Sequence, residues 1–309
     1  MSLPTITVLM STYNGEKYLR QQLDSILCQQ DVEVKVLIRD DGSTDETKCI
    51  LEEYSQYNEN IKVYEAENVG AKQSFLELVN DTDTDTEYYA FCDQDDIWLE
   101  RKLISAIEKI LHYDAERPRL YYSRVKRVGE NLEQLSNVFE KHYHTERFGA
   151  VLVNRAAPGC TMVWDRCTMK YLRMYRPQIF YMHDSWTLQV CLAVNGVAIY
   201  DDNSYILYRQ HGSNVIGGLK KMKKSKLQLF VYRVKKFLDF SYDYNAISEQ
   251  LLTGYSELMS DENRKLCELI VSARKSWRAR LKILFSRELR TPYFVINLKF
   301  RIRVLVNKL

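Results

Sequence analysis

The N-terminal third of the chain alternates between short apolar runs and longer helical patterns, and this alternation constrains the fold more than any other feature. Apolar runs occupy residues 6–10, 34–38, 61–64 and 88–92, and each leads into a polar turn and then a helical spacing of apolar residues. Strands that alternate with helices form right-handed βαβ units. We therefore expect an α/β fold with a mainly parallel sheet flanked by helices.

The element boundaries follow from the same pattern. Ser43 or Thr44 is expected to cap the second helix, and the fourth helix is expected to begin near Ile97. Further short strands are expected at residues 120–122, 161–164 and 197–200. Beyond residue 219 the pattern predicts a largely helical and basic segment. Alternation typical of a strand could occur only at the last residues.

Three carboxylates follow the fourth apolar run, at Asp93, Asp95 and Asp96. This concentration of negative charge at one strand end is costly unless a cation offsets it. A hard divalent ion such as Mg²⁺ or Mn²⁺ prefers one or two carboxylates together with phosphate oxygens. The cluster therefore predicts a site for a metal-bridged phosphate compound.

Polar side chains also follow the other three strands. In chain order they are Thr12, Tyr13, Asn14, Asp40, Asp41 and Asn68. Ligands of parallel sheets bind outside the carboxyl ends of the strands. Carboxylates there can accept hydrogen bonds from a base or a ribose. We therefore expect these residues to share one nucleotide pocket with the carboxylate cluster.

The formal net charge of +3 conceals an asymmetry. Residues 219–309 hold 21 Lys and Arg against 8 Asp and Glu, a net +13, which leaves −10 for residues 1–218. Parts of opposite charge are expected to have different partners. We expect an acidic domain at residues 1–218 and a basic helical region at residues 219–309 that could contact a membrane or another subunit.

The cysteines and the hydropathy indicate a cytoplasmic protein. The seven cysteines are scattered and include no Cys-x-x-Cys pair, which argues against a disulfide framework or a thiolate zinc site. No apolar stretch approaches the ~20 residues that span a bilayer, and no signal segment is evident. Neither secretion nor membrane insertion is expected.

Four motifs carry a family resemblance: Ser11-Thr-Tyr-Asn14, Asp40-Asp-Gly-Ser-Thr-Asp45, Asn68-Val-Gly70 and Asp93-Gln-Asp-Asp96. In order and spacing they resemble the family-2 glycosyltransferases, which have the GT-A fold, over residues 5 to about 217. Within that family, the runs at 92–98 and 208–217 look most like bacterial rhamnosyltransferases of cell-wall or capsular polysaccharide assembly.

The resemblance implies an inverting, metal-dependent enzyme. It would transfer L-rhamnose from dTDP-β-L-rhamnose to a lipid-linked glycan at the inner face of the cell membrane. A homodimer is compatible with the family. The rivals are the same enzyme class with a UDP-hexose or UDP-N-acetylhexosamine donor, a sugar-nucleotide pyrophosphorylase, and a membrane-recruited scaffold without catalysis. A pyrophosphorylase would open with a glycine-rich basic loop, which residues 8–20 lack.

The resemblance also implies roles for the donor-site residues. Thr12 and Asp41, with Asp40, would hold the base, and Asp93 would reach the ribose or the diphosphate. Asp95 would bind Mg²⁺ or Mn²⁺, with His211 as a further metal or diphosphate contact. Arg209 would pair with a phosphate or form a surface ion pair. Tyr13, Asn14 and Asn68 would complete the donor site, and Asp96 would cap a helix or support the metal ligands.

Asp184 is the catalytic base that the resemblance implies. It would take the proton from an acceptor hydroxyl, and an Asp with a pKa near ~3.9 is ionised at neutral pH. Inverting members usually carry an acidic residue before this Asp, whereas this chain has His183. From the sequence alone, an Asp before Ser185-Trp186 reads as a helix cap.

Acceptor contacts are expected from a glycine segment and from tryptophans. Gly159 lies in a segment that lines the acceptor site in the family. Trp98, Trp164 and Trp186 could stack on sugar faces, and core packing is the alternative for each. His142, His144 and the loop at 81–85 are expected to be solvated surface.

The basic tail has two notable segments. Residues 220–226 contain five lysines, and residues 294–306 interleave cations with large apolar side chains. Such segments lie on anionic membranes, where each cation near the surface contributes ~1 kcal/mol. The alternatives are a solvated helical face packed on the catalytic body, or nucleic acid, for which no recognised module is present. We expect an anionic membrane surface and no nucleic acid.

Overall fold

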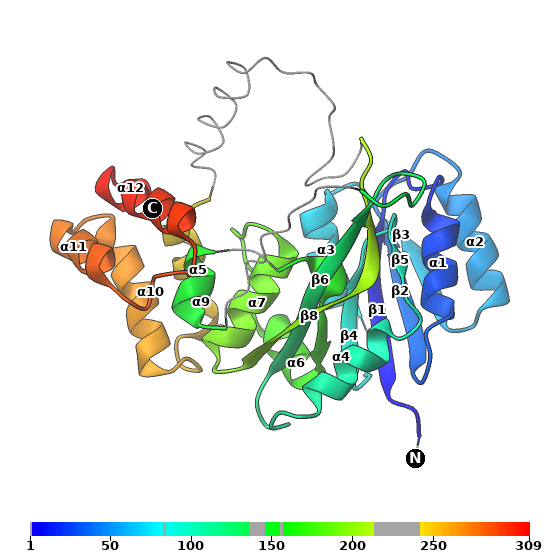
Figure 1. Ribbon diagram of the computed structural model, residues 1–309, viewed down its shortest axis with the longest axis horizontal. Helices are drawn as coiled ribbons and strands as arrows, with labels where there is room; N and C mark the ends of the chain where they lie inside the picture. Colours follow the sequence, from blue (N-terminus) through cyan, green and yellow to red (C-terminus); the bar gives the residue numbers. More distant parts are fainter. Residues whose placement is uncertain (1, 83–84, 136–145, 155–156, 213–241) are drawn as a thin grey trace.

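The computed structural model describes residues 2–82, 85–135, 146–154, 157–212 and 242–309. In these residues a single eight-stranded sheet has helices on both faces and is followed by a helical C-terminal region (Figure 1). The strand order is β3-β2-β1-β4-β7-β6-β8-β5. The expected α/β fold and the helical C-terminal region are thereby confirmed.

The N-terminal half of the sheet is parallel. β1 (Thr5–Thr12) lies between β2 (Glu33–Asp40) and β4 (Tyr88–Cys92), and β3 (Ile61–Glu65) pairs with β2. The helices α1 (Leu19–Leu27), α2 (Thr47–Tyr57) and α3 (Ala71–Asp81) connect these strands. Thr12 pairs with Asp40 and Met10 pairs with Cys92, so the turns that follow the three strands meet at one edge.

The other half of the sheet is mixed. β7 (Val163–Asp165) is antiparallel to both β4 and β6 (Arg119–Val128), and β6 is parallel to β8 (Val197–Arg209). The edge strand β5 (Ile97–Trp98) is antiparallel to β8. The expected strands at 120–122 and 197–200 are therefore parts of longer ones. Gly159–Thr161 forms a short 3₁₀ turn, η1, so β7 begins later than expected.

Three local expectations were wrong. The fourth helix, α4 (Lys102–Ile110), begins after Trp98, because Ile97 and Trp98 pair with β8. Neither Ser43 nor Thr44 caps α2, which begins at Thr47; the Ser43 hydroxyl donates to Asp40 Oδ1 at 2.6 Å instead. The last residues are helical rather than extended.

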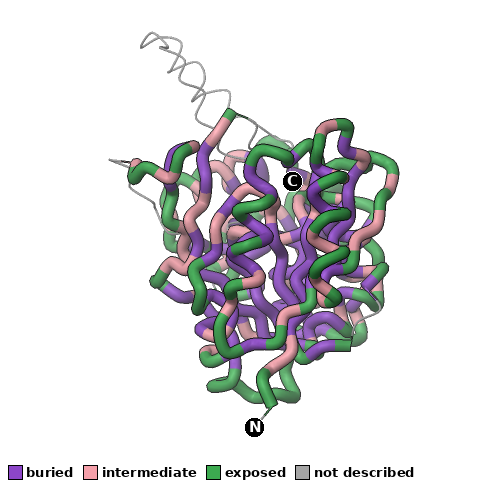
Figure 2. The backbone as a smooth tube through the Cα atoms, turned by 90° about the vertical axis from the view of Figure 1, so that its right-hand side faces the viewer, coloured by how far each residue is buried: buried purple, intermediate pink, exposed green. Residues whose placement is uncertain are grey.

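Two hydrophobic clusters cover the two faces of the sheet. In Figure 2 the buried segments gather in the middle of the molecule, and the exposed ones form its outer turns. Trp164 is fully buried, with its ring 4.4 Å from that of Phe91. Core packing, and not sugar stacking, therefore explains Trp164.

The C-terminal helices share the larger of these clusters. They are α9 (Tyr244–Tyr255), α10 (Asp261–Ala273), α11 (Trp277–Phe285) and α12 (Phe294–Leu305), and they pack beside α5 (Phe148–Val153), α6 (Arg166–Met174) and α7 (His183–Ala193). The domain boundary at 218/219 lies outside the described residues and stays a prediction. His142, His144, residues 83–84 and the lysines at 220–226 also lie outside them.

No helix in the described ranges combines the length and the apolar character that crossing a membrane requires.

Asp165 is buried at the end of β7, where its side chain contacts β6 and α6. Its replacement tests how much these contacts stabilise the fold. Its carboxylate accepts hydrogen bonds from Arg119 Nε at 2.8 Å and from the Thr168 backbone N–H at 2.8 Å. Asp165→Ala leaves the buried Arg119 uncompensated, and we expect the free energy of unfolding to fall by about 3–5 kcal/mol in urea titrations. Glu53→Ala removes the exposed partner of Arg20 and should cost no more than about 1 kcal/mol. Equal losses would contradict this assignment.

Candidate active site

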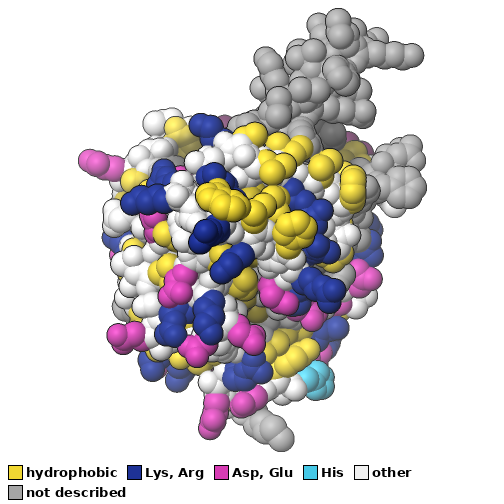
Figure 3. Space-filling model, turned by 90° about the vertical axis from the view of Figure 1, so that its left-hand side faces the viewer, with side chains coloured by type: hydrophobic (Ala, Val, Ile, Leu, Met, Phe, Trp, Pro, Cys, Tyr) yellow, Lys and Arg dark blue, Asp and Glu magenta, His cyan; other side chains and the backbone are white. Residues whose placement is uncertain are grey.

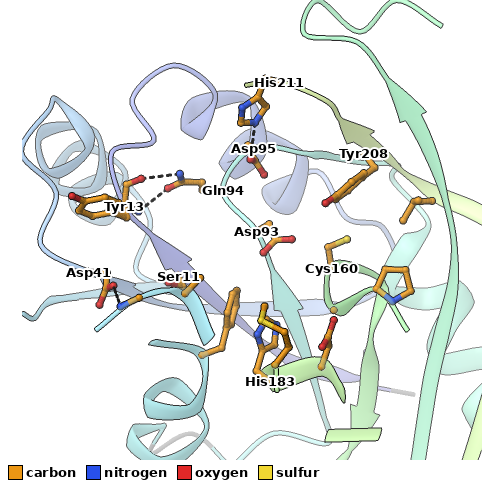
Figure 4. A pocket seen from close by; sticks show the side chains of 18 of the residues that line it. Ser11, Tyr13, Asp41, Asp93, Gln94, Asp95, Cys160, His183, Tyr208 and His211 are labelled. Atoms are coloured by element: carbon orange, nitrogen blue, oxygen red, sulfur yellow. Dashed lines mark hydrogen bonds and ion pairs between the residues drawn. The ribbon is translucent and has the colours of Figure 1, made fainter. Parts of the chain in front are cut away.

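A cavity of about 870 Å³ opens at the carboxyl ends of β1, β2 and β4 (Figure 4). The predicted site residues that line it are Tyr13, Asn14, Asp41, Asn68, Asp93, Asp95, Gly159, Asp184 and His211. They come from turns after β1, β2, β3, β4 and β8 and from the segment around η1 and α7. The structure therefore brings together most of the residues that the sequence predicted.

Asp95 and His211 face each other across one wall of the cavity. Asp95 Oδ2 lies 2.8 Å from His211 Nε2, as Figure 4 shows. The ring of Tyr18 lies 4.8 Å from the imidazole, and its hydroxyl donates to Glu130 at 2.9 Å. Tyr18 thus packs against His211 and is itself held by Glu130.

This donor set fits a divalent cation. Carboxylate oxygens suit both Mg²⁺ and Mn²⁺, whereas an imidazole nitrogen favours Mn²⁺. Asp95 and His211 would hold such an ion, and Asp93 lines the same cavity beside them. Enzymes with this fold typically depend on a divalent metal.

Crowding of carboxylates raises two pKa values beside these ligands. Burial, together with the charges of Asp95 and Asp184, raises the pKa of Asp93 to about 7. Burial, together with the charges of Asp95 and Asp93, raises the pKa of Asp96 well above its ordinary range. A cation in the cavity would offset this repulsion.

Asp96 does not line the cavity. Its Oδ1 accepts the backbone N–H of Arg209 at 3.0 Å, so it ties the carboxylate turn to the end of β8. Its role is therefore to support the turn, and it caps no helix, since α4 starts at Lys102 with Arg101 before it.

Arg209 also supports the turn, which corrects its expected phosphate contact. The guanidinium is buried. Its Nε donates to the Asp95 backbone oxygen at 2.9 Å, and its Nη1 donates to the Glu130 backbone oxygen at 2.6 Å. A third donor reaches Gln21 Oε1 at 2.7 Å. Because Arg209 does not line the cavity, it positions Asp95 and contacts no ligand there.

Asp184 lies in the first turn of α7, where the helix dipole favours a carboxylate. Its Oδ1 accepts the Ser185 backbone N–H at 2.5 Å. Burial raises its pKa to about 6, which is well suited to a general base near neutral pH. The helix-cap reading fails, because α7 already begins at His183 and its N-cap is Met182.

His183 forms the wall beside Asp184. Its ring stacks on Phe75 at 4.0 Å and meets Phe91 edge-on at 4.7 Å, and burial lowers its pKa to about 3. The imidazole is therefore neutral. Among the described residues its Nδ1 has no hydrogen-bond partner. This chain thus places a neutral ring directly before Asp184.

Gly159 makes room for this pair. A β-carbon at Gly159 would lie 2.8 Å from His183 Nε2 and 3.2 Å from Asp184 Cβ. Any side chain there would press on the wall that carries Asp184.

Asp41 closes the opposite end of the cavity. Its carboxylate forms an ion pair with Arg39 and accepts the Gly70 backbone N–H at 2.8 Å and the Val69 backbone N–H at 3.1 Å. It thereby joins the turn after β2 to the turn after β3. Asn68 lies in that second turn, beside Asp41.

Thr12 and Asp40 do not line the cavity, which corrects their expected contact with a base. Both are fully buried, and the Thr12 hydroxyl donates to Asp40 Oδ1 at 2.9 Å. Asp40 Oδ2 accepts the Ser43 backbone N–H at 2.8 Å across Gly42, whose φ is +78°. The two residues therefore shape the turn that presents Asp41.

The expectation that Trp98 and Trp186 contact the acceptor was wrong. They are 3% and 1% exposed, and neither lines the cavity. The Trp98 ring lies 3.5 Å from Lys102 Nζ, a buried ammonium whose pKa burial lowers to about 8. The Trp186 ring lies 6.3 Å from that of Tyr255, so it joins α7 to α9.

Several lining residues were not predicted. Gln94 holds Tyr13, accepting its backbone N–H at 2.8 Å and donating to its backbone oxygen at 3.0 Å. Cys160, Tyr208 and Arg127 line the far wall. Gln94, Cys160 and Tyr208 each lie inside a motif that the sequence singled out, whereas no pattern in the sequence marks Arg127.

Comparison with known proteins bears on both the fold and the site. The family model described as Glycosyl transferase family 2 matches residues 7–169. A dTDP-rhamnosyl transferase, RfbG of Shigella flexneri, is 31% identical over 80% of this chain and 89% of its own length. The putative teichuronic acid biosynthesis glycosyltransferase TuaG of Bacillus subtilis is 28% identical over 80% of this chain and 98% of its own.

A solved structure supports the fold. Staphylococcus aureus TarS (residues 1–349) in complex with UDP-GlcNAc superposes with a TM-score of 0.56 and 18% identity, over 98% of this chain and 80% of that one. Similarity at this level of identity concerns the fold alone. The superposition thus supports the fold described above.

The facing pair Asp95–His211 predicts a specific pattern of metal binding. We expect calorimetry to show Mn²⁺ binding that Asp95→Ala weakens at least about tenfold. His211→Ala should weaken Mn²⁺ more than Mg²⁺, because imidazole is a poorer ligand for Mg²⁺. Asp202→Ala, which removes an exposed carboxylate in the middle of β8, serves as the control. Unchanged affinity in both site variants would place the ion elsewhere.

Proposed function

The chain belongs to glycosyl transferase family 2 and is a glycosyltransferase, and we propose that it transfers L-rhamnose from dTDP-β-L-rhamnose to a lipid-linked glycan. The observation that carries the proposal is that Asp41, Asp95 and Asp184 line one cavity. The 31% identity to a dTDP-rhamnosyl transferase supports the choice of donor. The product would be a cell-wall or capsular polysaccharide with inverted anomeric configuration.

The donor would lie across the strand ends. Asp41, Asn68 and Tyr13 line the part of the cavity suited to the base, because their polar atoms come from adjacent turns. Asp93 would reach the ribose or the diphosphate, and its carboxylate lies within electrostatic reach of both Asp95 and Asp184. Asp95 and His211 would hold a divalent ion. That ion would stabilise the negative charge on the departing diphosphate as a Lewis acid.

Asp184 would act as the base. Its carboxylate removes the proton from the acceptor hydroxyl as the oxygen attacks the anomeric carbon, and the bond to the diphosphate breaks on the opposite side. Because His183 is neutral, Asp184 supplies the carboxylate at this wall of the cavity. The Ser185 backbone N–H and hydroxyl both donate to Asp184 Oδ1, at 2.5 and 3.2 Å, and would hold the carboxylate in place.

A lipid-linked acceptor would place the enzyme at the inner face of the cell membrane as a peripheral protein. The described part of the basic C-terminal region is compatible with that location, since it holds 13 Lys and Arg against 7 Asp and Glu in residues 242–309. A homodimer remains a prediction.

Donor identity can be tested by thermal shift in the presence of Mn²⁺. A ligand that binds the native state raises the melting temperature, and we expect dTDP-rhamnose and dTDP to do so at lower concentrations than UDP-glucose or UDP-GlcNAc. Mass spectrometry of products formed with membrane lipids should then show the added deoxyhexose. Stabilisation by UDP-sugars alone would favour the UDP-dependent alternative, and no response to any nucleotide sugar would favour a scaffold.

Asp184→Asn should separate binding from transfer. The amide keeps the shape of the side chain but cannot accept the proton, so we expect transfer to fall about 10²–10⁴-fold while the donor-induced thermal shift persists. In the wild type, kcat/KM should decline about tenfold per pH unit below a pKa of about 6, because protonated Asp184 is no base. Asp31→Asn alters an exposed carboxylate and serves as the control. Wild-type transfer by Asp184→Asn would exclude this base.

A further inference from the structure

The outer side of α11 and α12 exposes large apolar side chains that a water-soluble surface rarely gathers. On α12, Phe300 and Val304 are buried against the body, whereas Phe294 and Leu305 on the other side are 78% and 66% exposed. On α11, Ile283 is buried, and Phe285 is 76% exposed. A helix that is apolar on both sides needs a second apolar environment.

These exposed side chains border a groove. It has a volume of about 380 Å³ and is lined by Leu284, Phe285, Arg290, Leu298, Arg301, Ile302 and Leu305. Figure 3 shows the face that carries these helices, with apolar side chains gathered in its upper part and Lys and Arg around them. We call this face the α11–α12 surface, defined by these groove residues with Trp277, Leu281, Phe294 and Val295.

The charge of this segment is almost entirely of one sign. Residues 274–309 hold eleven Lys and Arg and a single acid, Glu288, which gives a net charge of +10. Large apolar side chains surrounded by cations match the boundary between headgroups and acyl chains in an anionic bilayer. A symmetric contact with a second copy would place this charge against itself, which disfavours that partner.

We propose that the α11–α12 surface docks the enzyme on an anionic lipid bilayer, with Phe285 and Phe294 entering the acyl region and Arg290 and Arg301 meeting lipid phosphates. In Figure 1, α12 lies toward the end of the molecule at which β1 and β4 finish, where the cavity opens. The biological reason for docking rests on the proposed function. Lipid binding itself does not, since it requires neither donor nor acceptor.

Flotation of the full chain with vesicles tests this docking. We expect phosphatidylcholine vesicles that contain phosphatidylglycerol to bind the wild type at least about tenfold more tightly than pure phosphatidylcholine vesicles, with the difference shrinking at high salt. The double variant Phe285→Gln/Phe294→Gln should lose at least about tenfold in affinity for the anionic vesicles. Arg290→Glu/Arg301→Glu should lose the preference for anionic lipid.

Matched controls lie on the opposite side of the molecule. Tyr57→Gln replaces an aromatic that is 82% exposed on α2, and Lys35→Glu reverses an exposed cation on β2; both should bind vesicles as the wild type does. Transfer to a soluble acceptor fragment should persist in both double variants, so a failed docking and a failed function remain distinguishable. Equal vesicle binding by all variants would overturn the proposal. So would light scattering that shows a wild-type dimer, dispersed by the Phe variant, without vesicle binding.

Discussion

Repulsion among carboxylates at the end of β4 is the constraint around which the site is built. Asp93, Asp95 and Asp96 follow one another within four residues, and Asp184 approaches from α7. The protein offsets part of this charge with its own groups: His211 meets Asp95, and the Arg209 backbone and guanidinium bind the turn. Burial first, and the neighbouring carboxylates second, raise the pKa values of Asp93 and Asp96. A divalent ion would supply the rest, which explains why metal and donor would bind together.

The first half of the fold follows from sequence because it depends on local periodicity. The four apolar runs became β1 to β4, and parallel pairing placed their turns at one edge without further information. The mixed half was harder to predict, because β5 and β7 depend on antiparallel partners that are remote in the chain. A two-residue strand such as Ile97–Trp98 carries no periodicity of its own. The family resemblance could not locate the ends of this strand either, because it rested on sequence motifs and not on which strands pair.

The same distinction holds within the site. Motifs that resemble the family predicted that Asp95, His211 and Asp184 share one site, and the three side chains line one cavity. Whether Thr12 or Arg209 faces a ligand or supports the turn depends on hydrogen bonds to residues far along the chain. Trp98 and Trp186 illustrate the limit for aromatics, whose sequence signal is the same in a core and in a sugar site. His183 was noted only as a departure from the family pattern, and the structure shows a neutral ring between two phenylalanines.

Anomalous diffraction from crystals grown with Mn²⁺ and dTDP tests the central claim directly. The account predicts one manganese peak in bonding contact with Asp95 and His211, with the diphosphate on the same ion and the thymine at the end of the cavity closed by Asp41. A peak bound to other residues, or a nucleotide that lies outside the cavity shared by Asp41, Asp95 and Asp184, would contradict it.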